Sequence, residues 1–124
     1  MAKVCILGGG FIGRFYAESL IGRRSKDVIT VVYSRSQSSV DRFSKDFSIP
    51  YSTIDMEDAV AHSDTEVVVV ALPNYQHELA IDLCVKYKKA VICTKPLGRN
   101  AEEALRMMMA CENAGIFSGY LEDL

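Results

Sequence analysis

Short, almost continuously apolar runs alternate along the chain with longer segments whose apolar residues recur at helical spacing. Continuous apolar runs rich in β-branched residues are typical of strands that are covered on both faces. The runs lie at Lys3–Leu7, Val28–Tyr33, Glu66–Leu72, Ala90–Cys93 and Ile116–Ser118. A further short strand is expected at Pro50–Ser52, within a less regular stretch. Strands that alternate with helices pair in parallel through right-handed crossovers. The pattern therefore predicts an α/β fold with a doubly wound, mostly parallel sheet and helices on both faces.

The segments between these runs predict the helices. They lie at Ser38–Phe47, from about Asp55, at Tyr75–Tyr87 and at Asn100–Asn113. In the third segment, helical spacing predicts a buried face that consists of Leu79, Ala80, Leu83, Cys84 and Tyr87. In the fourth it predicts a buried face of Ala104, Leu105, Met108 and Cys111, and Gly115 follows as a helix C-terminus favours.

The length of 124 residues suits one domain, and neither a repeat nor a linker divides the chain. A formal net charge of −2 gives no electrostatic reason to expect nucleic acid or an anionic membrane as partner. No run approaches the roughly 18 apolar residues of a membrane span, and the start lacks the apolar core of a signal peptide. The four cysteines lie far apart within apolar runs, without metal-ligand spacing. We therefore expect buried thiols, no metal site and a reducing, cytoplasmic compartment.

Residues 8–13, GGGFIG, form a glycine-rich turn between the first apolar run and a helical pattern. Gly8 would allow the sharp turn, Gly10 would let a pyrophosphate approach the backbone, and Gly13 would let helix and strand pack closely. The unpaired N–H groups at the start of the helix would face the phosphates. The turn thus predicts a Rossmann-type dinucleotide site; a purely structural strand-to-helix turn is the alternative.

The residues after the second apolar run distinguish among the ligands that such turns bind. Domains that bind NAD or FAD usually place an acid there, about twenty residues on, to bind the ribose 2′-OH, and methyltransferases that use S-adenosylmethionine commonly do so too. Here the run ends in Ser34-Arg35-Ser36, with no acid in reach. An arginine and two hydroxyls suit a 2′-phosphate, which a carboxylate would repel. This favours NADP over NAD, unless Arg35 is only a surface residue.

Two further polar clusters follow the apolar runs at Glu66–Leu72 and Ala90–Cys93. They are residues 73–77 (PNYQH) and 94–96 (TKP). Both lie at carboxyl ends of predicted parallel strands, where open α/β sheets bind ligands. Each residue also has a structural interpretation: Asn74 as a helix cap, His77 as an exposed first-turn residue and Lys95 as a surface lysine.

Taken in order, GGGFIG, SRS, ALPNYQH and VICTKPLGRNAEEA resemble the N-terminal domain of the Gfo/Idh/MocA oxidoreductase family over nearly the whole chain. The resemblance implies a dinucleotide-binding domain over residues 1–119, and over 120–124 the start of a connection to a second, substrate-binding domain. It places Lys95 beside the nicotinamide ring and the substrate, as the catalytic residue. The cofactor site that follows from the turns and the resemblance comprises Gly8, Gly10, Phe11, Ile12, Gly13, Ser34, Arg35, Ser36, Leu72, Pro73, Asn74, His77, Lys95 and Pro96. Thr94 departs from the family, which usually has glutamate there.

The resemblance implies hydride transfer between a nicotinamide cofactor, NADP or alternatively NAD, and the CH–OH group of a small sugar, cyclitol or related polyol. Lys95 would orient the hydroxyl and share its proton. Since the substrate domain and its catalytic aspartate and histidine lie beyond residue 124, we expect a fragment that is itself inactive, from a possible homo-oligomer. The alternatives are a non-catalytic module that binds or senses NAD(P), and an NADP reductase of the pyrroline-carboxylate type. The latter leaves the PNYQH run unexplained.

Overall fold

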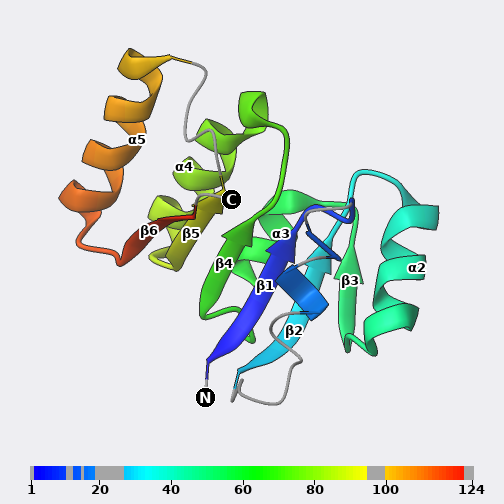
Figure 1. The fold of residues 1–124 in the computed structure, drawn as a ribbon. Coiled ribbons are helices and arrows are strands. Elements are labelled where there is room, and N and C mark those ends of the chain that lie inside the picture. The colour runs from blue at the N-terminus through cyan, green and yellow to red at the C-terminus, as the bar shows by residue number, and fades with distance from the viewer. Residues whose placement is uncertain (1, 11–12, 15, 19–26, 95–99, 122–124) are drawn as a thin grey trace.

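The computed structural model describes residues 2–10, 13–14, 16–18, 27–94 and 100–121, and of Asn74, Thr94, Tyr120 and Leu121 the backbone only. These residues form one sheet of six parallel strands in the order β3-β2-β1-β4-β5-β6 (Figure 1). The strands are β1 (Lys3–Leu7), β2 (Val28–Tyr33), β3 (Tyr51–Thr53), β4 (Val67–Val70), β5 (Ala90–Thr94) and β6 (Ser118–Leu121). The strand order reverses between β1 and β4. This is the doubly wound sheet that the alternation predicted.

The last strand lies later than the prediction of Ile116–Ser118. The chain is still leaving the preceding helix at Ile116, whose N–H donates to Cys111 O at 3.2 Å. Pairing with β5 then begins where Val91 N–H donates to Phe117 O at 3.0 Å, and Val91 lies opposite Ser118. The hydrogen bonds of the neighbouring strand therefore set where β6 begins.

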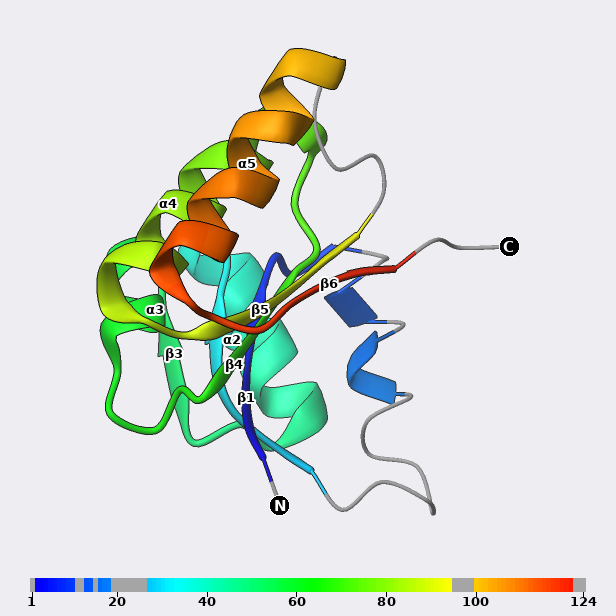
Figure 2. The ribbon, with the colours of Figure 1, turned by 90° about the vertical axis from the view of Figure 1, so that its left-hand side faces the viewer.

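Helices cover the sheet from both sides. They are α2 (Gln37–Phe47), α3 (Met56–Ala61), α4 (His77–Tyr87, after a 3₁₀ turn at Asn74–Gln76) and α5 (Ala101–Ala114). Residues 13–14 and 16–18 are helical too. Side-chain oxygens of Ser36, Asp55 and Asn100 cap α2, α3 and α5, since each accepts a hydrogen bond from a backbone N–H of the first turn. Figure 2 shows α3, α4 and α5 on one side of the sheet.

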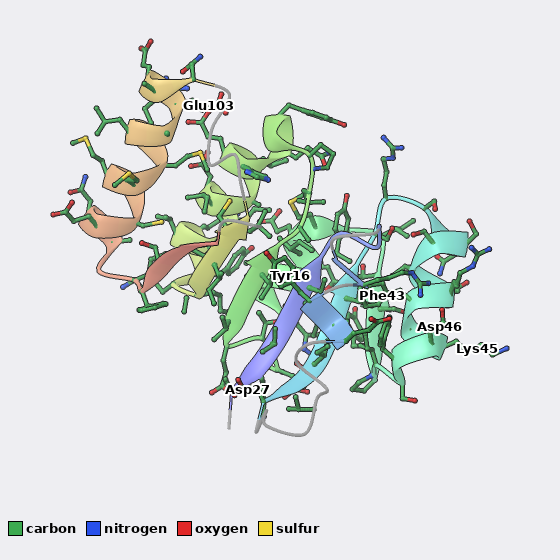
Figure 3. All side chains as sticks on the ribbon, viewed as in Figure 1. Tyr16, Asp27, Phe43, Lys45, Asp46 and Glu103 are labelled. Carbon is green, nitrogen blue, oxygen red and sulfur yellow. The ribbon has the colours of Figure 1, made fainter. Side chains whose placement is uncertain are left out.

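Each side of the sheet has its own core. On the α3–α5 side, residues of β1, β2, β4 and β5 pack against α3, α4 and α5. On the other side, Ala17 and the fully buried Phe43 of α2 pack on β1 and β2. Figure 3 labels Phe43 and Asp46 on α2. Arg14 joins the helical residues after the glycine turn to α2: its guanidinium lies 5.6 Å from the Phe43 ring centre and donates to Asp46 Oδ2 at 2.8 Å. The start of that helix is thereby fixed against α2.

The predicted buried faces of α4 and α5 are partly wrong. Leu79 is 54% exposed, and Leu105 and Met108 are 57% and 59% exposed. The buried stripes are His77, Ala80, Ile81 and Cys84 in α4, and Glu103, Met107 and Cys111 in α5. In both helices a polar residue, His77 or Glu103, therefore lies on the buried face, and a neighbouring apolar stripe faces outward.

All four cysteines, Cys5, Cys84, Cys93 and Cys111, are free and buried, as the sequence predicted. Burial raises the pKa of the Cys5 and Cys93 thiols to about 12 and raises that of Cys84 as well. Among the described residues there is no group of three or more histidine, cysteine or acidic side chains that could hold a metal ion. No helix in the described part of the chain is long and apolar enough to cross a membrane.

Candidate cofactor site

A cavity of about 300 Å³ lies where β1, β2 and β4 end, at the point where the strand order reverses. Figure 1 shows that the carboxyl ends of these strands meet at one edge of the sheet. Crevices of this kind are where open α/β sheets bind their ligands. The cavity is lined by residues from three turns: Gly8, Gly9, Gly10, Ser34, Arg35, Ser36, Ser39, Ala71, Leu72, Pro73, Tyr75 and Gln76.

Backbone hydrogen bonds hold the three strand ends together. The N–H of Gly8 donates to Tyr33 O at 2.9 Å, which joins the glycine turn to β2. The N–H of Ala71 donates to Leu7 O at 2.8 Å, which joins the turn after β4 to β1. The turns that line the cavity therefore continue the backbone hydrogen bonding of the sheet.

The first turn of the cavity requires glycine at two positions. Gly8 has φ +116°, which side chains with a Cβ rarely adopt, and a Cβ there would also collide with the carbonyl of Ala71. A Cβ on Gly13 would collide with the carbonyl oxygen of Gly8, because the helix begins directly against the strand end. These are the roles that the glycine spacing predicted for Gly8 and Gly13.

Gly10 faces open space instead. A Cβ at Gly10 would meet no described atom within 4 Å, and the helix begins here, with Arg14 N–H donating to Gly10 O at 3.0 Å. A group bound in the cavity can therefore approach the backbone of this turn at Gly10. This geometry fits a pyrophosphate, the contact predicted for Gly10.

The turn after β2 supplies the hydroxyls and the cation of the cavity. Ser34 is buried and its Oγ donates to Ser39 Oγ at 2.8 Å. Ser36 Oγ accepts from Ser39 N–H at 3.3 Å, as the cap of α2, and Arg35 is exposed at the cavity. None of the described residues that line the cavity is acidic. The cavity therefore presents a cation and hydroxyls, without a carboxylate, next to the N-terminus of α2.

The turn after β4 forms the opposite wall. Leu72 and Pro73 line the cavity, and Gln76 N–H donates to Pro73 O at 2.9 Å, which closes the turn. Tyr75 also lines the cavity and is 54% exposed, so the lining includes an aromatic residue. Asn74 begins the 3₁₀ turn. Its predicted place along the cofactor stays a prediction.

His77 is not among the described residues that line the cavity, and its interpretation as an exposed first-turn residue is wrong. Its membership of the cofactor site stays a prediction. Its side chain is fully buried. Nε2 lies 2.7 Å from the carbonyl oxygen of Leu72 and Nδ1 lies 3.3 Å from Cys93 Sγ. The ring lies behind the wall of the cavity because α4 turns its first residue toward the sheet.

Four of the predicted site residues, Phe11, Ile12, Lys95 and Pro96, lie outside the described residues. Five residues that line the cavity were not predicted: Gly9, Ser39, Ala71, Tyr75 and Gln76. Gly9 belongs to the motif, and the structure gives it a role, since a Cβ there would lie 2.8 Å from Ser39 Oγ. Ser39 lies one helical turn after Ser36, so the spacing indicates that the two residues share a face of the helix. The spacing does not indicate that this face borders a cavity.

The strand order, the glycine turn at the crevice and the open approach at Gly10 define a dinucleotide-binding domain of the Rossmann type. The family described as "Oxidoreductase family, NAD-binding Rossmann fold" matches residues 2–119, and the chain belongs to this family. The predicted family and fold are therefore confirmed.

Relatives and solved structures agree with this assignment. The chain is 33% identical over 94 residues to trans-1,2-dihydrobenzene-1,2-diol dehydrogenase of Bos taurus, covering 76% of the chain and 28% of the relative. It is 27% identical over 113 residues to inositol 2-dehydrogenase 1 of Mycolicibacterium vanbaalenii, covering 91% and 33%. The crystal structure of a probable dehydrogenase from Thermotoga maritima has the same fold, with a TM-score of 0.90 at 20% identity, covering 95% of this chain and 35% of that one. The chain thus spans about a third of the length of the proteins it matches.

Proposed function

We propose that the cavity binds a nicotinamide dinucleotide and prefers the phosphorylated form, NADP(H). The observation that carries the preference is the turn after β2, where Arg35, Ser36 and Ser39 line the cavity and none of the described lining residues is acidic. A guanidinium and hydroxyls at the N-terminus of α2 favour a 2′-phosphate, through charge-assisted hydrogen bonds and the helix dipole. The pyrophosphate would lie at Gly10, where the backbone is open.

We propose further that the parent protein transfers a hydride between this cofactor and the CH–OH group of a polyol. The names of the two relatives, a dihydrodiol dehydrogenase and an inositol dehydrogenase, support a substrate that carries neighbouring hydroxyls. Lys95, which the family resemblance places beside the substrate, would orient the reacting hydroxyl and help to share its proton. Residues 1–119 would be the cofactor domain, and 120–124 would lead to the substrate domain.

A non-catalytic module that binds or senses NAD(P) is the second candidate. It requires only the cavity, whose described lining residues would contact the cofactor. This candidate would be excluded if the parent protein turned over a polyol and Lys95→Ala abolished that turnover.

Titration of the chain with NADPH and with NADH, followed by fluorescence of the reduced nicotinamide and by thermal shift, tests the cofactor proposal. Both ligands should raise the melting temperature as mass action requires, and NADPH should do so at lower concentration. Absence of binding by both at millimolar concentration would refute the cofactor site. Tighter binding of NADH would refute the preference for the phosphorylated form.

A further inference from the structure

The imidazole of His77 joins two strand ends from beneath the cavity. Its Nε2 lies 2.7 Å from the carbonyl oxygen of Leu72, two residues after β4, and its Nδ1 lies 3.3 Å from the thiol of Cys93, one residue before the end of β5. A carbonyl oxygen only accepts, so Nε2 carries a proton and donates it to Leu72. In the neutral ring Nδ1 then accepts, and the thiol of Cys93 donates to it.

The state of the thiol agrees with these roles. Cys93 is 1% exposed, and burial raises its pKa to about 12, so the sulfur keeps its proton at neutral pH. With both hydrogen bonds made, the tautomer of the ring is fixed by its surroundings, and so is its orientation.

The two partners of the ring belong to two neighbouring segments, the turn after β4 and the end of β5. Leu72 and the following Pro73 form one wall of the cavity. In the sequence, Cys93 lies directly before Thr94, Lys95 and Pro96. The turn after β4 has its own closing hydrogen bond, Gln76 N–H to Pro73 O, but that bond lies within the turn and does not attach it to β5. The imidazole provides an attachment between the turn and the neighbouring strand.

We infer that His77 is a positioning residue for the cofactor: it holds the Leu72–Pro73 wall at a fixed distance from β5 through its two hydrogen bonds. This inference rests on the proposed dinucleotide site and gives His77 a role other than direct contact with the cofactor. Loss of the ring would leave the glycine turn and Arg35 unchanged but would free the opposite wall of the cavity to move. Affinity would fall because the cofactor must then order that wall on binding.

Two pairs of variants test the inference. His77→Leu fills the space but makes neither hydrogen bond, whereas His77→Gln keeps an N–H that can reach the carbonyl of Leu72. Cys93→Ala removes the donor to Nδ1, whereas Cys93→Ser keeps one. Cys84→Ala is the matched control, since Cys84 is a fully buried thiol of α4 in the same core. The measurements are the dissociation constant for NADPH, well below the melting temperature, and hydrogen exchange of the amides of residues 72–76 without ligand.

We expect His77→Leu to weaken NADPH binding about tenfold and to speed amide exchange in the turn, with His77→Gln recovering most of both, because the hydrogen bond to a buried carbonyl is restored. Cys93→Ala should fall between the wild type and His77→Leu, and Cys84→Ala should bind as the wild type does. If His77→Leu does not fold, the comparison of Cys93→Ala with Cys93→Ser decides in its place.

Wild-type affinity and wild-type exchange in folded His77→Leu would overturn the inference, as would equal losses in the leucine and glutamine variants. A wild-type chain that binds neither NADPH nor NADH would instead refute the proposed function. The positioning role would then be decided by the exchange measurement alone: unchanged exchange in His77→Leu and in Cys93→Ala refutes it.

Discussion

Replacing Arg35 by glutamine removes the only cation among the described residues that line the cavity, and keeps most of the length of the side chain. A hydrogen bond to a charged group contributes about 1.5–3 kcal/mol, and solvent screening at an exposed site such as Arg35 favours the lower end. About 1.5–2 kcal/mol corresponds to a roughly 10- to 30-fold weaker binding of NADPH. The affinity for NADH, which lacks the 2′-phosphate, should change by no more than about twofold on the same reasoning.

The assay is a fluorescence titration of wild type and variant with both reduced dinucleotides, at low and at high salt. The preference of the wild type for NADPH should shrink as salt rises, because the contact is between exposed charges. Arg42→Gln is the matched control: Arg42 is an exposed arginine of α2 that does not line the cavity, so the same net charge is lost away from the site. Equal losses for NADPH and NADH in Arg35→Gln, or the same loss in Arg42→Gln, would refute the assignment of Arg35 to the phosphate.

Two further predictions concern stability. Gly13→Ala should lower the free energy of unfolding by about 1–3 kcal/mol, the usual cost of overpacking, because its Cβ would collide with the backbone carbonyl of Gly8. A thermal melt indistinguishable from that of the wild type would contradict the close packing of helix on strand. Above about pH 9, the free energy of unfolding should fall as pH rises. The thiols of Cys5 and Cys93 ionise from their ordinary pKa of 9.0 in the unfolded chain but keep their protons up to about pH 12 when folded, so the unfolded state releases protons first. Each such thiol steepens this fall by up to about 1.4 kcal/mol per pH unit. The test is urea unfolding of the wild type and of Cys93→Ala at about pH 8 and pH 10. If the thiols were exposed, the free energy of unfolding would change with pH equally in both proteins.

The sequence was sufficient where the signal is local to the chain. β1 and β2 have the predicted bounds, since a parallel strand covered on both faces is apolar along most of its length. Asn100 and Gly115 delimit α5 because a cap is a contact within one turn of helix. The same holds for the glycine turn, whose function depends on backbone conformation and close approach within six residues.

Where the outcome depends on distant segments, sequence spacing was not enough. α4 carries two apolar stripes, one through Leu79 and Leu83 and another through Ile81 and Cys84, and helical spacing alone does not choose between them. The sheet chooses, since the stripe that packs inward brings His77 between Leu72 and Cys93. The rotation that exposes Leu79 is thus the same rotation that buries His77.

The rotation of α4 also bears on the function of the site. A histidine among polar residues after a strand suggests a residue that binds the cofactor. The sequence looks the same, however, whether the side chain faces the cavity or supports the cavity wall from behind. The two cases differ in what a substitution should do. A contacting residue contributes only to binding, whereas a supporting residue also alters the order of the empty site, which is why amide exchange without ligand is the measurement that separates them. For His77, the buried ring and its two hydrogen bonds predict that the change is already visible before any cofactor is added.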